Sequence, residues 1–212
     1  MIPLGFERLE PAEMLARAAA FAERMSRRRS VREFSSDPVD VDVIRRCVAA
    51  AGCAPSGAHK EPWTFVLVTD PATKSRIRAA AEEEERAFYA GRAGEQWLAD
   101  LQPFETNADK PFLDAAPALL VVFAQTKAAD GGKHYYVPES VGIAVGFLLC
   151  ALHDAGLATL THTPSPMKFL AQILDRPRHE RPFLLLPIGY PADGCQVPDL
   201  RRKPLADLLF ER

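Results

Sequence analysis

The feature that most constrains the fold is an uninterrupted apolar segment, Ala118 to Gln125, with the sequence ALLVVFAQ. Its apolar residues do not alternate with polar ones, which is typical of a strand covered on both faces of a sheet. The chain has 212 residues, of which 48% are hydrophobic and 25% charged. It is therefore long enough to bury such a layered core within one domain, residues 1–212.

Other segments alternate between helical and extended patterns. Asp70-Pro71 begins a helix that runs to about Arg92, because aspartate caps a helix and proline suits its first turn. Residues 63–69 form a strand that we expect, like 118–125, to be central. The remaining predictions are helices after Asp40 to residue 52, at 139–155 and at 167–174, and strands at 157–161 and 183–189.

Composition limits the classes of partner and the compartment. A formal net charge of −2 gives the whole molecule no field that favours nucleic acid or anionic membrane. The longest apolar run, Val141 to Leu152, is shorter than the roughly 20 residues of a membrane span, and the first residues lack a signal-peptide pattern. The 4 cysteines have no metal or disulfide spacing, and no second ligand accompanies His59. We expect a cytoplasmic protein without a metal site.

Two segments favour a dimer. The predicted helix at 139–155 is apolar nearly all round, and its small residues Gly142, Ala144 and Gly146 permit close approach of another backbone. The tail from Pro198 is rich in charge and leucine but has no partner within itself. Both are expected to pack against a second copy of the chain.

Four separated segments together offer what a bound flavin mononucleotide (FMN) needs. Arginines can fork hydrogen bonds onto a phosphate or a flavin carbonyl, and glycine lets backbone N–H groups approach a flat ligand. The arginine run alone equally suits a solvated helix end or a nucleic-acid contact, and the glycine turn equally suits a plain connection. The segments are Arg28 to Arg32, Pro55 to His59, Thr161 to Thr163 and Arg201 to Lys203.

The acidic run Glu82 to Glu85 most simply forms a solvated helix face, with Glu82 and Arg86 as an ion pair. Glu85 and Tyr89 share one face by the same spacing, so a carboxylate and a phenol can grip one ligand.

Six collinear segments closely resemble the iodotyrosine deiodinase branch of the nitroreductase superfamily. The similarity runs in register from about residue 24 to 207. The segments are Arg28 to Arg32, Ala54 to Trp63, Glu82 to Tyr89, Ser140 to Ala144, Thr161 to Pro164 and Pro187 to Pro191.

This resemblance implies an α+β fold with a central mixed, mainly antiparallel sheet flanked by helices, in a homodimer whose C-terminal arms (about 195–212) are exchanged. It also implies FMN as cofactor. Thr163 corresponds to the hydroxyl donor to flavin N5. The implied FMN ligands are Arg28, Arg29, Ser30, Arg32, Ser56, Gly57, Thr161, His162, Thr163 and Arg202.

The resemblance further implies a substrate site under a lid of about residues 90–112. Ala58 corresponds to the backbone donor to the substrate phenolate, and Glu85, Tyr89 and Lys110 to the ligands of the amino-acid head group. A zwitterion needs a carboxylate for its ammonium and a cation for its carboxylate, and Glu85 and Lys110 supply one of each. We expect Lys110 in a polar surface loop that orders over the ligand.

The expected activity is FMN-dependent reductive dehalogenation of halotyrosines, such as 3-iodotyrosine to tyrosine and iodide. Alternatives are a general nitro or quinone reductase that uses NAD(P)H, and a non-enzymatic flavin-binding protein. The electron donor stays open between NAD(P)H and a transient reductase. Two lid positions, Ala108 and Asp109, are smaller or more polar than the family pattern. Eukaryotic members carry an N-terminal membrane anchor, and we expect this chain to be a soluble bacterial-type form without one.

Overall fold

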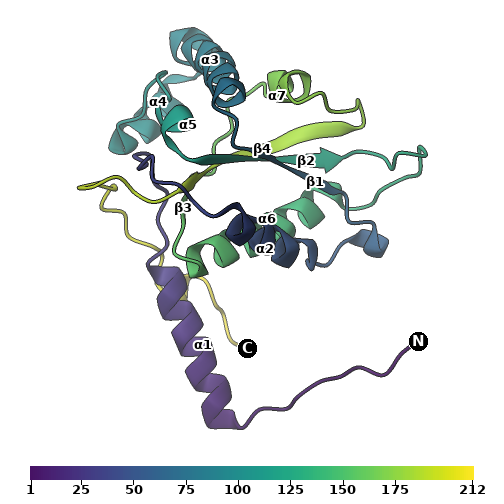
Figure 1. Cartoon of the computed structure of the whole chain (residues 1–212). Helices are drawn as coiled ribbons and strands as arrows, with labels where there is room; N and C mark the ends of the chain where they lie inside the picture. The colour runs from purple at the N-terminus through teal and green to yellow at the C-terminus, as the bar shows by residue number, and fades with distance from the viewer.

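The computed structural model describes residues 1–212 and has three layers, with helices on both sides of one sheet (Figure 1). All strand pairs in the sheet are antiparallel, and an isolated bridge between Ser30 and Thr159 is parallel. The predicted α+β fold with a mixed, mainly antiparallel sheet is therefore confirmed. In spatial order the strands are β1 (Trp63–Val68), β2 (Ala118–Gln125), β4 (Glu180–Gly189) and β3 (Ala158–Thr159).

Strand β2 is buried on both faces, as its continuous apolar sequence predicts. Successive side chains of a strand point to opposite faces. Leu119, Val121 and Phe123 accordingly belong to one hydrophobic cluster, and Leu120 and Val122 belong to the other. All five are fully buried. Strand β2 therefore separates the two hydrophobic clusters of the core and contributes side chains to both.

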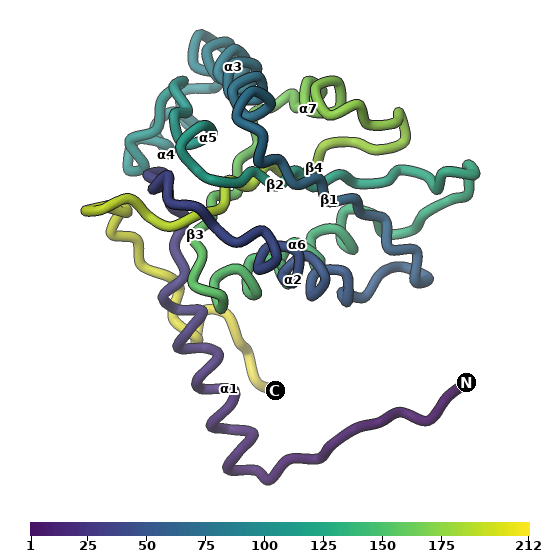
Figure 2. Tube along the Cα trace, in the orientation of Figure 1, coloured from purple at the N-terminus to yellow at the C-terminus, as the bar shows by residue number.

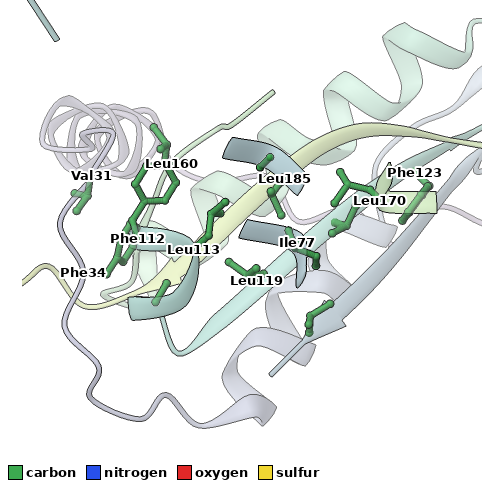
Figure 3. Close-up of a cluster of buried hydrophobic side chains, with 14 residues drawn as sticks. Val31, Phe34, Ile77, Phe112, Leu113, Leu119, Phe123, Leu160, Leu170 and Leu185 are labelled. Atoms are coloured by element: carbon green, nitrogen blue, oxygen red, sulfur yellow. The ribbon is translucent and has the colours of Figure 1, made fainter. Parts of the chain in front are cut away.

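Helices from distant parts of the chain cover the two faces. Figure 3 shows Ile77 and Leu170 packed with Phe123 and Leu185 of the sheet in the first cluster. The helices above the sheet in Figure 1 are α3 (Pro71–Ala87), α4 (Glu95–Leu101), α5 (Phe112–Ala115) and α7 (Lys168–Ile173). The opposite face is covered by α2 (Val41–Gly52) and α6 (Val137–Asp154).

Several predicted elements differ from the structure. The strand expected at 157–161 is only the two-residue β3, and the strand expected at 183–189 begins earlier, at Glu180. Strand β1 lies at an edge of the sheet rather than at its centre, because this chain supplies no neighbour beyond it. The helix expected to reach Arg92 is α-helical only to Ala87, and it continues as a π-helical turn, η2 (Phe88–Arg92). Asp70 caps its start as predicted, accepting a hydrogen bond from the Thr73 N–H at 2.8 Å.

Helix α1 (Pro11–Ser26) has no counterpart among the predicted elements. None of its residues is buried, and Met14, Leu15 and Phe21 are exposed. It projects away from the three layers, with the N-terminal segment beyond it (Figures 1 and 2). Its C-terminal end is attached to α6, where Arg24 pairs with Asp154 and accepts, through its carbonyl, a hydrogen bond from His153 at 2.9 Å.

Helix α6 is the one helix long and apolar enough to cross a membrane by length and composition alone. Its buried face, which includes Val141, Leu148 and Leu152, packs in the second hydrophobic cluster. Ile143 and Phe147 lie exposed on its other side. The helix is therefore a layer of the core with one apolar side left uncovered.

The C-terminal segment leaves the layers and runs beside α1 (Figure 2). Residues 199–212 are exposed and include the short 3-10 helix η4 (Leu205–Asp207). Arg202 fastens the segment by donating hydrogen bonds to the carbonyls of Ser26 at 2.7 Å and Arg28 at 2.6 Å. Beyond that point Leu208 and Phe210 lie exposed.

We predict that Gly189→Ala destabilises the fold. A Cβ atom at Gly189 would lie 2.6 Å from Cδ of Pro117, whose ring cannot move aside. The expected loss is about 1–3 kcal/mol of unfolding free energy, measured by denaturant titration. As a control, Gly52→Ala in α2 meets no atom within 4 Å. Its stability should not fall, and equal loss in the two variants would contradict this steric explanation.

Candidate functional site

Five arginines line one surface cavity of about 310 Å³ that contains no carboxylate. Such a set of cations without counter-charges suits a phosphate. The structure therefore brings Arg28, Arg29, Ser30, Arg32 and Arg202 together, as predicted, although they come from both ends of the chain. The cavity is lined by Arg28, Arg29, Ser30, Arg32, Phe104, Pro198, Leu200, Arg201 and Arg202.

Backbone contacts hold this arginine cavity in shape. Ser30 bridges to Thr159, and the adjacent Val31 N–H donates to the Thr159 carbonyl at 3.1 Å. The Arg29 side chain donates to the carbonyl of Pro198, which connects the N-terminal arginine segment to the C-terminal tail. Arg201 also lines the cavity, although among the basic tail residues only Arg202 was singled out as a ligand.

A second cavity, of about 270 Å³, adjoins the first at Arg32, which lines both. It lies between α3 with η2 on one side and the residues that follow β3 on the other. It contains most of the predicted substrate ligands. The lining residues are Arg32, Glu84, Glu85, Phe88, Tyr89, Trp97, Leu101, Thr106, Lys110, Phe112, Leu160, Thr161, His162, Thr163 and Ser165.

A buried ion pair lies in this second cavity, which we call the ion-pair cavity. Nζ of Lys110 lies 3.3 Å from Oε2 of Glu85, and the side chains are only 3% and 13% exposed. Burial raises the pKa of Glu85 and lowers the pKa of Lys110, and in each case the partner's charge opposes the shift. Lys110 Nζ also lies 5.7 Å from the centre of the Tyr89 ring. Glu85, Tyr89 and Lys110 thus meet as predicted.

Lys110 is not on the surface loop that its polar neighbours suggest. Its backbone N–H donates to Oε1 of Glu82 at 2.8 Å, and its Nζ donates to the carbonyl of Asn107. Glu82 in turn accepts from Nε of Arg78 at 2.7 Å, not from Arg86 as the spacing predicted. The acidic run therefore contributes Glu82 to a structural ion pair rather than to a solvated face.

The segment after β3 presents Thr161, His162 and Thr163 to this cavity. His162 and Leu185 of β4 exchange backbone hydrogen bonds at 2.9 and 3.0 Å, which fixes the segment against the sheet. Thr161 and Thr163 are exposed and His162 is buried, as period-two alternation requires. Both hydroxyls are therefore accessible to a ligand.

The His162 side chain is 7% exposed, and its Nε2 atom has no hydrogen-bond partner. That atom lies 4.0 Å from Oε1 of Glu85. Burial, and then the charges of Lys110 and Arg32, lower the pKa of His162 from 6.5 to about 3. The imidazole is consequently neutral at physiological pH.

Aromatic residues of η2 and α4 line the ion-pair cavity. Trp97 of α4 packs edge-to-face on Phe88 of η2, with ring centres 5.2 Å apart. Leu101 and Thr106 also line the cavity. None of these residues was predicted from the sequence as part of the site. The one sequence signal for them was Trp97, an isolated tryptophan in a polar segment.

Ser56, Gly57 and Ala58 do not join the other residues within one chain. They lie in the connection from α2 to β1, across the molecule from residues 28–32 (Figure 1), and line neither cavity. The Gly57 N–H donates to Oγ of Ser140 at 3.2 Å, and a Cβ atom at Gly57 would lie 2.6 Å from the Tyr135 carbonyl oxygen. Ala58 is exposed and has a left-handed φ of 52°.

Comparisons with known proteins agree with this geometry. The nitroreductase family model matches residues 25–190. An iodotyrosine deiodinase of Haliscomenobacter hydrossis is 56% identical, covering 98% of this chain and 96% of the relative. Iodotyrosine deiodinase 1 of Rattus norvegicus is 49% identical, covering 93% of this chain and 71% of the relative.

A solved structure extends the similarity to three dimensions. A crystal structure of oxidized iodotyrosine deiodinase bound to FMN and 3-iodo-L-tyrosine superimposes with a TM-score of 0.77 at 32% identity. The similarity covers 87% of this chain and 96% of that one. The chain therefore belongs to the nitroreductase family, in the branch that the iodotyrosine deiodinases form.

Proposed function

We propose that this protein binds FMN and catalyses reductive dehalogenation of halotyrosines, converting 3-iodotyrosine to tyrosine and iodide. The observation that carries the proposal is the buried Glu85–Lys110 pair, which lies in a cavity directly beside the five-arginine cavity. A general nitroreductase has no need of a largely buried carboxylate and ammonium held 3.3 Å apart. A zwitterionic amino acid needs both charges.

The residues present fit FMN. The five-arginine cavity suits the phosphate, with Arg28, Arg29 and Arg202 as its ligands. Ser30 lines this cavity and Arg32 lines both it and the ion-pair cavity, where Thr161 to Thr163 would contact the flavin edge. Bound FMN supplies the redox chemistry, namely the two electrons that, with one proton, exchange a carbon–iodine bond for a carbon–hydrogen bond and release iodide. NAD(P)H or a transient reductase supplies those electrons.

The protein's own side chains orient the substrate and exclude water. Glu85 takes the substrate ammonium, Lys110 takes its carboxylate, and the Tyr89 hydroxyl bonds either group. Trp97 and Phe88 close the cavity from the lid side, which strengthens these charge contacts by removing water. In this proposal the Thr163 hydroxyl would donate to flavin N5, and the backbone of Ala58 from a second copy of the chain would donate to the substrate phenolate.

A homodimer completes this site in the proposal. Ser56, Gly57 and Ala58 lie too far from the arginine cavity within one chain, so a second copy must bring them to it. Features that fit a partner chain are the uncovered side of α6, the free edge of β1 and the exposed C-terminal arm. We propose that the part of the arm beyond Arg202, which stays fastened to its own chain, reaches across to the other copy, and that the assembly works in the cytoplasm.

One experiment separates the three candidate functions. The FMN-loaded protein is reduced by light without oxygen, and 3-iodotyrosine is then added. In a deiodinase, 3-iodotyrosine rapidly reoxidises the flavin and iodide is released. The flavin of a general reductase is reoxidised only when a nitroaromatic or a quinone is added instead. A flavin-binding protein without activity responds to none of these substrates.

Replacing Arg28 and Arg29 by alanine should strip FMN from the protein. Each arginine contributes a charge-assisted hydrogen bond of about 1.5–3 kcal/mol, so the two together weaken FMN binding by about a hundredfold or more. Flavin absorbance per chain after gel filtration measures the loss. The control is Arg27→Ala, since Arg27 does not line the arginine cavity. A fully loaded double variant would refute the assignment of the phosphate site.

Glu85→Gln should sharply reduce deiodination of 3-iodotyrosine while sparing reduction of nitroaromatics. Removing one partner of a desolvated charge pair costs about 2–5 kcal/mol, which is roughly 30-fold to several thousandfold in kcat/KM. Iodophenol, which has no amino-acid head group, should be a poor substrate of both forms. Glu83→Gln on the exposed face is the matched control. Equal loss towards both substrate classes would show that Glu85 serves the flavin or the fold.

Ending the chain after Lys203 should cost the dimer and FMN together. This truncation keeps Arg202, so loss of flavin would come from the missing arm rather than from a missing phosphate ligand. Sedimentation velocity and flavin absorbance are measured on the same samples. The control ends after Phe210 and removes only Glu211 and Arg212. A monomer that retains full flavin would contradict the shared site.

A further inference from the structure

The His162 imidazole is the one buried polar group of the ion-pair cavity whose potential bond is unmade. Its Nε2 atom has no partner, and the side chain is 7% exposed. Buried polar atoms without a partner are rare because each costs free energy, so such an atom beside a binding cavity points to a bond made in another state. The carboxylate of Glu85 lies close to it, with Oε1 at 4.0 Å.

Substrate binding changes the partners of Glu85. In this structure its Oε2 atom pairs with Lys110 at 3.3 Å. A zwitterion whose carboxylate takes Lys110 draws that cation away from Glu85. The carboxylate of Glu85 then binds the substrate ammonium without help from Lys110. Burial already raises the pKa of this carboxyl group. A further donor is needed to keep it charged and correctly turned.

We propose that His162 is a positioning residue that donates a hydrogen bond from Nε2–H to Glu85 when an amino-acid substrate is bound. This inference rests on the proposed function and adds to it a residue that sets specificity for the zwitterion. A carboxylate can only accept, so it favours the tautomer that carries the proton on Nε2. A closure of about 1 Å converts the present 4.0 Å separation into a hydrogen bond.

A neutral imidazole suits this task better than a cation. The charged groups that face it are Glu85, Lys110 and Arg32. Burial, and then the charges of Lys110 and Arg32, lower the pKa of His162 to about 3. At neutral pH it therefore adds a donor without adding a positive charge. A third cation would repel the substrate ammonium from Glu85.

The test measures the Kd of 3-iodotyrosine for the oxidised, FMN-loaded protein. Quenching of the flavin fluorescence reports binding. His162→Phe removes the donor but keeps a planar ring against Phe112, whose ring centre lies 5.4 Å away. The expected increase in Kd is about tenfold to a hundredfold. His162→Gln, whose amide nitrogen reaches the position of Nε2, should restore affinity to within about threefold. The control is His179→Gln, outside both cavities.

A double-mutant cycle shows whether the imidazole acts through Glu85. In a Glu85→Ala background, His162→Phe should change Kd by less than about twofold, because position 85 then offers no side-chain acceptor to the imidazole. Affinity for 2-iodophenol should be unchanged throughout. An equally large effect in that background would overturn the inference.

Other outcomes are equally decisive. If the wild type binds no 3-iodotyrosine, the proposed function itself fails. If the wild type binds and His162→Phe binds equally well, only this inference fails. His162→Leu, which is smaller and also apolar, is the second variant if phenylalanine is not accommodated. Loss of FMN from both apolar variants would assign the imidazole to the flavin or the fold and overturn the inference.

Discussion

The burial of β2 and β4 on both faces is the constraint on which the rest of the structure depends. Because their side chains point alternately up and down, the sheet needs a layer of helices on each side, and distant segments must meet to provide them. One consequence concerns the site. The residues after β3 are fixed by backbone bonds to Leu185 of β4, so Thr161 to Thr163 are presented from the edge of a rigid sheet.

Charge is divided sharply between two adjoining cavities. One contains five arginines and no carboxylate, whereas the other contains a carboxylate balanced by a lysine. Arg32 lines both cavities and, after burial and the charge of Lys110, contributes to the lowered pKa of His162. An anion can therefore bind on one side without disturbing recognition of a zwitterion on the other. This division favours an amino-acid substrate beside a phosphorylated cofactor over a general reductase pocket, whose substrates carry no paired charges.

Local sequence predicted much of the fold and part of the site. Hydrophobic continuity predicted β2 to the residue, and Asp70 predicted the start of α3, because both signals come from neighbouring residues. Glu85 and Tyr89 line the same cavity because they are four residues apart along α3 and its continuation η2. The exposed helix α1 escaped prediction because none of its residues is buried. The edge position of β1 also escaped it, since apolar content does not reveal which neighbours a strand lacks.

The sequence by itself determined the residue types of the site and their family pattern: arginines for a phosphate, and opposite charges for a zwitterion. Only the tertiary structure decided which charges are buried and which atoms they meet. Lys110 reads as a surface residue in its polar segment, yet Glu82, 28 residues away, accepts from its backbone and turns its side chain towards Glu85. The partnerless Nε2 of His162 is likewise invisible in the sequence, because burial depends on contacts between distant segments.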